Sequence, residues 1–171
     1  TVSYATSGIG TTVHLAGEAL IAAAEIEVQH VPYPGSGPAI TDAINGTVAC
    51  NVETFGTLMP HHRAGALRIV AALADMRTAI APDVPTAKEQ GFDVSAGTYN
   101  LLAAPVGTPR AVLDPVAAAI GRIMARPALQ ARLSALGING VSTSDPDHAR
   151  AFVAAEIARW TPVVRRLGIA L

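Results

Sequence analysis

The chain has 171 residues, of which 50% are hydrophobic and 15% are charged, and its formal net charge is −1. This length buries a full core and fits one domain, or one domain with an extension. The near-neutral charge and an aromatic content of 4% argue against a nucleic-acid partner. A single cysteine, Cys50, excludes an intrachain disulfide. The longest apolar runs, such as residues 69–74, fall far short of the roughly 20 residues of a membrane helix.

The first stretch, residues 3–15, reads as a strand, a glycine loop and a helix that starts at residue 11 or 12. Gly8 and Gly10 allow a tight turn with backbone amides on its inside. The hydroxyl side chains available to this turn, and to capping the helix, are those of Ser7, Thr11 and Thr12. Because a helix N-terminus favours an anion, the stretch predicts an anion-binding loop, with a plain helix cap as the alternative. A nucleotide P-loop is excluded because Thr11 stands where that motif needs a lysine.

The next elements alternate between strands and helices. In chain order, the patterns predict a strand over 26–31, a helix from 36 or 38 to 45, a strand over 47–52, a helix over 55–64, the strongest strand over 67–73, a short helix over 86–90 and a short strand over 92–94. Alternation with short loops is typical of the α/β class. We therefore expect a three-layer fold, with a mainly parallel sheet covered by helices on both faces.

Candidate binding residues follow the ends of the first three predicted strands. They are the five residues of the glycine loop (Ser7, Gly8, Gly10, Thr11 and Thr12), then Tyr33, Gly35 and Ser36, and finally Glu53 and Thr54. Ligands of parallel sheets bind beyond the carboxyl ends of the strands, so we expect the three loops to converge on one edge. Two interpretations of Glu53 remain open: it is either a group of the binding cleft or a solvated acid in a loop.

The remainder of the chain has a different pattern. It predicts a strand over 98–104, a helix over 109–125, a helix from 127 to the glycine at 137, and a long amphipathic helix that ends near 168 and is kinked at Pro162. Ser144 and Asp145 supply the capping signal of this last helix.

Other polar or reactive residues favour structural roles. His14 is interpreted as a capping or packing residue, and Trp160 as a packing anchor. Cys50 is predicted to be an inert core thiol. His61 and His62 point about 100° apart on a helix and are interpreted as a solvated helix end, so no metal site is predicted. No catalytic residue, metal or cofactor is expected, and the chain is predicted not to be an enzyme.

Five segments resemble, in order, the extracytoplasmic solute receptors of tripartite tricarboxylate transporters, the Bug/TctC family. The segments are residues 4–18, 30–42, 83–92, 104–109 and 156–160. The resemblance implies a periplasmic binding protein of the type II-like class, with two α/β lobes around a cleft. It also implies a small organic carboxylate as ligand, a membrane permease as partner, no catalysis and no cofactor.

The resemblance covers only the second half to two-thirds of a family member. It implies that residues 1–97 are the second ligand-binding lobe, and that residues 98–171 are a crossover strand and C-terminal helices that return towards the missing first lobe. The sequence starts directly on a strand pattern without a signal peptide, so we expect part of a longer periplasmic protein. Apolar surface that the first lobe would cover predicts a homodimer of the isolated chain.

The family pattern also assigns the loops. The residues of the glycine loop match the family's carboxylate-binding loop, and those at 33–36 match its second cleft loop. Glu53 stands where the family usually has Asp. Ala49 and Asn51 replace a usual Asp and a usual apolar residue, and Asn100 stands where Gly is common. Two other functions stay open, the effector-sensing domain of a transcription regulator and a small α/β hydrolase, although Ser7 lacks the G-x-S-x-G frame.

Overall fold

The computed structural model describes residues 2–138, 140–141 and 146–169, and the chain forms two compact units. The first unit comprises Thr1–Thr98 and Pro162–Leu171, and the second comprises Tyr99–Thr161. Among the described residues, no helix is both long enough and apolar enough to cross a bilayer.

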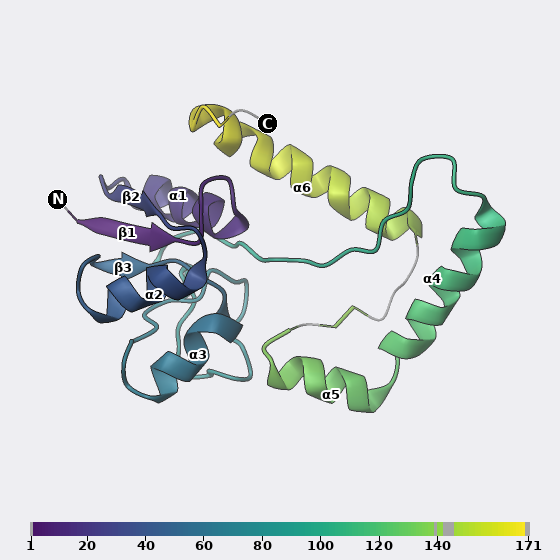
Figure 1. Cartoon of the computed structure of the whole chain (residues 1–171), viewed down its shortest axis with the longest axis horizontal. Helices are drawn as coiled ribbons and strands as arrows, with labels where there is room; N and C mark the ends of the chain where they lie inside the picture. Colours follow the sequence, from purple (N-terminus) through teal and green to yellow (C-terminus); the bar gives the residue numbers. More distant parts are fainter. Residues whose placement is uncertain (1, 139, 142–145, 170–171) are drawn as a thin grey trace. The chain divides into compact units, whose positions relative to one another are not determined.

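The first unit contains a parallel sheet with a helix after each strand (Figure 1). The elements are β1 (Ser3–Thr6), α1 (Thr12–Ala24), β2 (Gln29–Pro32), α2 (Ser36–Ile44), β3 (Cys50–Asn51) and α3 (Phe55–Arg63). The strand order is β2-β1-β3, and Ala5 is in register with Val31 and with Asn51. The predicted α/β class with a parallel sheet is confirmed.

The two faces of β1 carry different helices. Successive side chains of a strand point to opposite faces. Ala5 packs with Ala39 of α2 and with Val48, so α2 covers one face. Tyr4 lies against Gly17 of α1, on the opposite face. The helices therefore lie on both faces of the sheet, as the sequence predicts.

A second apolar cluster joins α3 to the irregular chain that follows it. Met59 of α3 packs with Ala72, Ala81 and Val84, which all lie in loop segments. This segment includes the predicted strongest strand, over 67–73, and that prediction is wrong. Of this run only Ala72 joins a β-bridge, and its partner is Thr86.

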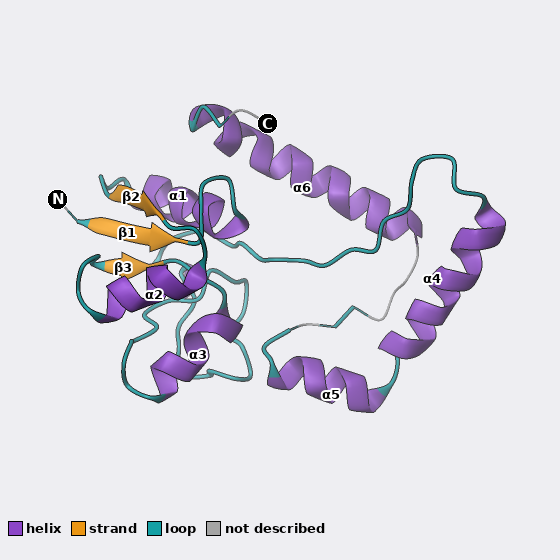
Figure 2. Ribbon diagram, viewed as in Figure 1, coloured by secondary structure: helices purple, strands orange, loops and turns teal. Residues whose placement is uncertain are grey.

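The physical reason lies in the partner segment. Ala72 donates to the Pro85 carbonyl at 2.8 Å and accepts from the Ala87 amide at 2.9 Å. Pro85 itself has no N–H, so a longer ladder is not possible there. The predicted strand over 92–94 is also absent, and Figure 2 shows no strand between α3 and α4. The predicted short helix is the 3₁₀ turn η1 (Lys88–Gln90).

The second unit consists of helices and an extended segment. The helices are α4 (Arg110–Met124), α5 (Pro127–Ala135) and α6 (Pro146–Arg166), whose last residues belong to the first unit. The predicted strand over 98–104 is wrong, because this segment finds no sheet partner among the described residues. The capping residues Ser144 and Asp145 lie outside the described residues. Self-association of the isolated chain stays a prediction.

Candidate functional site

The carboxyl edge of the sheet collects the N-termini of the three helices of the first unit. The three strands are parallel, so the loops that leave them emerge at the same edge. Those loops are residues 7–11 before α1, 33–35 before α2 and 52–54 before α3. Each helix start carries unpaired amides and a partial positive charge. The edge is therefore suited to an anion, and all of the predicted site residues lie in these loops or at the helix starts.

The glycine loop has two residues with positive φ angles, Gly8 at +136° and Gly10 at +75°. Thr11 is the N-cap of α1: its hydroxyl donates to the Gly8 carbonyl at 2.7 Å and accepts from the His14 amide at 3.3 Å. The Gly8 amide donates to Oγ1 of Thr6 at 3.3 Å. These internal bonds fix the shape of the loop.

The Gly10 amide donates to Nδ1 of His14 at 3.1 Å. The two glycine amides are thus used inside the protein. Within the described part of the chain, the amides of Ile9, Thr11 and Thr12 donate to no protein acceptor. These amides are donors that the loop can offer to a bound anion.

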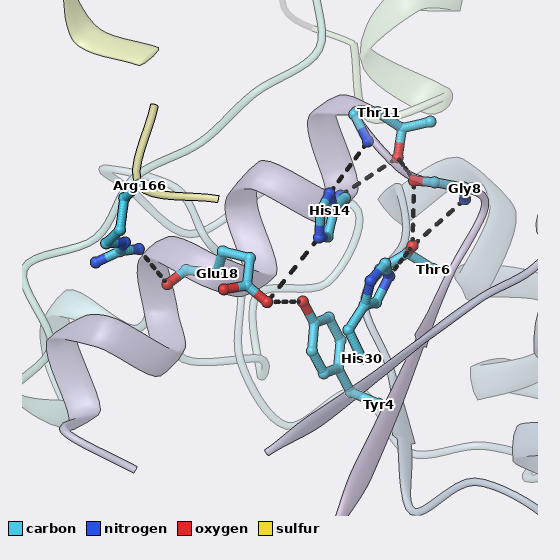
Figure 3. Close-up of polar contacts among 9 residues, drawn as sticks. Tyr4, Thr6, Gly8, Thr11, His14, Glu18, His30 and Arg166 are labelled. Carbon is cyan, nitrogen blue, oxygen red and sulfur yellow. Dashed lines mark hydrogen bonds and ion pairs between the residues drawn. The ribbon is translucent and has the colours of Figure 1, made fainter. Parts of the chain in front are cut away.

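A cluster of polar side chains between α1 and the sheet supports this loop (Figure 3). The buried ring of His14 stacks on the ring of His30, with centroids 4.0 Å apart, and His30 shares a 2.7 Å hydrogen bond with Oγ1 of Thr6. Nε2 of His14 lies 4.0 Å from Oε1 of Glu18, which accepts the Tyr4 hydroxyl at 2.6 Å. The capping and packing role predicted for His14 is confirmed.

Burial sets the charge state of the two stacked histidines. Removal from water lowers the pKa of both imidazoles below the usual value, and Glu18 opposes this shift. Nδ1 of His14 accepts the Gly10 amide, so the proton of the neutral ring is on Nε2, on the side of Glu18. Neutral His14 is thus the form that supports the loop.

The second loop positions α2 through Tyr33. The Tyr33 hydroxyl donates to Oδ2 of Asp42 at 2.6 Å, and its ring packs on the apolar cluster of Ala5. This hydrogen bond raises the pKa of Tyr33. Gly35 is the N-cap of α2, with a φ of +143° and no side-chain cap. The Tyr33 hydroxyl is therefore bound to a residue of α2. Ser36, the first residue of α2, lies at the carboxyl edge of the sheet.

The third loop contains polar atoms that lack partners. Oε1 of Glu53 accepts the Thr54 amide at 2.8 Å, and the Thr54 hydroxyl shares a 2.7 Å hydrogen bond with that of Thr57. Oε2 of Glu53 is buried without a partner, and so are Oδ1 and Nδ2 of Asn51. Asn51 is not among the residues that the sequence predicts to bind a ligand. Its sequence signal is an amide in a strand predicted to be buried.

The remaining candidate residues lie elsewhere. Nδ1 of His62 accepts the Ile69 amide at 3.3 Å, and the described residues contain no cluster suited to a metal ion. Cys50 is exposed, so its predicted place in the core is wrong. The reason is that β3 is a two-residue strand at the edge of the sheet. Trp160 donates to Oε2 of Glu156 at 2.9 Å on its own helix.

Comparison with known proteins agrees with this architecture. The family model described as the tripartite tricarboxylate transporter family receptor, TctC, matches residues 1–169. The chain belongs to the TctC receptor family. Protein BugT of Bordetella pertussis is 33% identical over 171 residues, which are 99% of this chain and 52% of BugT. This TctC chain therefore spans about half the length of the curated relatives that it matches.

Solved structures extend the comparison. Rpa4515 of R. palustris, solved with adipate, has a TM-score of 0.85 and 27% identity, covering 99% of this TctC chain and 56% of its own. MatC from Rhodopseudomonas palustris, solved with bound malate, has a TM-score of 0.80 and 28% identity, covering 95% and 56%. The family that the sequence motifs indicate is thus confirmed, and the fold of this chain is that of about half of these proteins.

Proposed function

We propose that this chain is the second ligand-binding lobe of a periplasmic solute receptor, which captures a small organic carboxylate and delivers it to a membrane permease. The observation that carries the proposal is the edge of the sheet, where three helix N-termini meet. At the first of these, the amides of Ile9, Thr11 and Thr12 find no acceptor among the residues that the structure describes. A carboxylate supplies acceptors of the required charge.

The comparisons support this ligand class. Two proteins of similar fold, Rpa4515 and MatC, are solved with the dicarboxylates adipate and malate. The name of the family supports the transport role. A solved structure of similar fold, a periplasmic transporter that is 30% identical to this chain, supports the periplasmic location. The proposed ligand residues are those of the three loops: Ser7, Gly8, Gly10, Thr11, Thr12, Tyr33, Gly35, Ser36, Glu53 and Thr54. In this proposal, residues 1–97 are the second lobe and residues 98–171 return towards a first lobe.

The proposed role needs no chemical step. Ser7 has no hydrogen-bonded base among the described residues. The two stacked histidines, His14 and His30, form hydrogen bonds with Gly10 and Thr6. We therefore infer binding without catalysis. Reproducible ester hydrolysis that is lost in Ser7→Ala would contradict this inference.

A matched pair of glycine variants tests the proposed site. Gly10 and Gly46 have φ angles of +75° and +76°, but only Gly10 lies in the candidate loop. Valine at either position should cost about 1–2 kcal/mol of stability, because a side chain is strained at positive φ. Titration calorimetry of the full-length gene product with small dicarboxylates should show at least a tenfold loss of affinity in Gly10→Val and none in Gly46→Val. Equal affinities in the two variants would contradict the site.

A further inference from the structure

The end of β3 holds three buried polar atoms without partners. They are Nδ2 and Oδ1 of Asn51 and Oε2 of Glu53, only two residues apart. Buried polar groups in native proteins are nearly always hydrogen-bonded, and leaving them unpaired is destabilising. Three such atoms in one short segment therefore indicate that a partner arrives from outside the chain.

Asn51 is the last residue of β3, and Glu53 lies two residues further along, in the loop that leads into α3. Asn51 is in register with Ala5, whose strand leads directly into the glycine loop. The carboxylate of Glu53 is fixed through Oε1, which accepts the Thr54 amide at the start of α3. Its second oxygen is left for a donor at the same strand edge as the glycine loop.

The three atoms define the chemistry of a partner. Oδ1 of Asn51 and Oε2 of Glu53 accept hydrogen bonds, while Nδ2 of Asn51 donates them. A bare carboxylate would satisfy Nδ2 only and would face the Glu53 oxygen, which repels it. A hydroxyl or an ammonium group donates to the acceptors, and a hydroxyl also accepts from Nδ2. The partner is thus a donor group.

We propose that Asn51 and Glu53 form a donor subsite, which selects carboxylate ligands that also carry a hydroxyl or ammonium group. This proposal rests on the function proposed above. Asn51 is the specificity-determining residue, since both polar atoms of its amide are buried without a partner among the described residues, and Glu53 is its acidic neighbour in the sequence. Carboxylate capture is assigned to the amides of the glycine loop, and discrimination between carboxylates to this subsite.

Ligands that differ in a single substituent test the subsite. Succinate, malate and aspartate share a four-carbon dicarboxylate and differ by hydrogen, hydroxyl and ammonium; adipate and 2-aminoadipate form a six-carbon pair. Titration calorimetry of the full-length gene product should give at least tenfold tighter binding for a donor-bearing member than for its parent in one series. The comparison of malate with aspartate then separates a hydroxyl from an ammonium ligand.

Variants separate the subsite from the fold. Asn51→Leu should reduce the preference to less than twofold, and its melting temperature without ligand should not fall, because an unpaired buried amide is removed. Asn51→Ala gives the same readout with a smaller side chain. Asn45→Leu is the control and should keep the preference, because Asn45 is an exposed residue at the C-terminal end of α2, away from the subsite.

The outcomes are distinguishable. Binding of the dicarboxylates with no preference for donor-bearing members, or a preference that survives both Asn51 variants, overturns the subsite and leaves the proposed function standing. Failure of all five ligands to bind overturns the proposed function and the subsite with it. A preference that is lost in both Asn51 variants and kept in Asn45→Leu supports both.

Discussion

The two faces of β1 are built from opposite chemistry. On the α2 face, Ala5 packs among small apolar side chains. On the α1 face, Tyr4 and Thr6 are almost fully buried, yet they form hydrogen bonds with Glu18 and His30. The stability of the apolar face depends on side chains of the right volume. The stability of the polar face depends on a hydrogen-bond partner for each buried polar group. The polar face also supports the glycine loop through His14, so its geometry bears on binding as well as on stability.

The largest expected effect on the polar face comes from closing the gap between α1 and β1. A Cβ at Gly17 would lie 2.6 Å from Cε2 of Tyr4. The Tyr4 ring is held by its bond to Glu18 and by the ring of His30, 4.9 Å away, so it has little room to shift. Gly17→Ala should therefore destabilise the protein by about 2 kcal/mol, net of its gain in helix propensity.

Denaturant unfolding of Gly17→Ala alongside Gly37→Ala checks this expectation. Gly37 lies in the first turn of α2 with nothing within 4 Å of an added Cβ, so its alanine variant should be neutral or more stable by about 0.5 kcal/mol. Similar stabilities for the two variants would show that the α1 face is less tightly packed than described.

A smaller effect is expected from removing one hydroxyl on each face. Tyr4→Phe deletes the 2.6 Å bond to Glu18 and leaves a largely buried carboxylate oxygen without its donor. We expect a loss of about 1.5 kcal/mol, because bonds to charged groups are the stronger kind. Tyr33→Phe deletes a bond of the same length to Asp42 on the α2 side.

The matched Tyr33→Phe variant should cost about 0.5 kcal/mol, because Tyr33 is only partly buried and water can replace the lost partner of Asp42. Chemical denaturation of the two variants measures the difference. If Tyr33→Phe were the more damaging of the two, the distinction between the faces would be wrong.

The smallest effect concerns pH. Burial lowers the pKa of His14 and His30, so between the folded-state pKa and about 6.5 the unfolded chain binds more protons than the folded one. Stability therefore rises with pH through this window and falls on acidification. Glu18 and Tyr4 also face the stacked rings, and the carboxylate of Glu18 reduces the effect.

Melting temperatures measured between pH 7.5 and 5.0 follow this change. His14→Asn keeps an acceptor near the Gly10 amide without titrating, so its melting temperature should fall less steeply with acid than that of the unchanged chain. An unaltered slope in His14→Asn would remove His14 from the explanation.

Local signals predicted much of the fold. The start of α1 follows from the capping hydroxyl of Thr11. The parallel sheet follows from the alternation of strands and helices with short loops between them. The strand predicted over 67–73 failed because strand formation depends on a partner, and the partner contains Pro85. The apolar pattern of one segment does not show whether another segment can pair with it.

The candidate site was predictable only at the level of loops. The sequence indicated the glycine loop, but it did not show that the Gly8 and Gly10 amides are used internally, since those bonds depend on Thr6 and His14 folding against them. The sequence also could not predict that the Asn51 amide lacks partners, because this depends on its burial at the end of β3.

The central claim is that the amides at the start of α1 bind a carboxylate. An NMR titration of the full-length gene product with small dicarboxylates, following backbone amide shifts, tests it most directly. The account predicts the largest shifts at Ile9, Thr11 and Thr12, with smaller shifts at Gly8 and Gly10, whose amides donate inside the protein. Saturable shifts elsewhere in the chain, with residues 8–12 unchanged, would contradict the claim and make the glycine loop a structural cap.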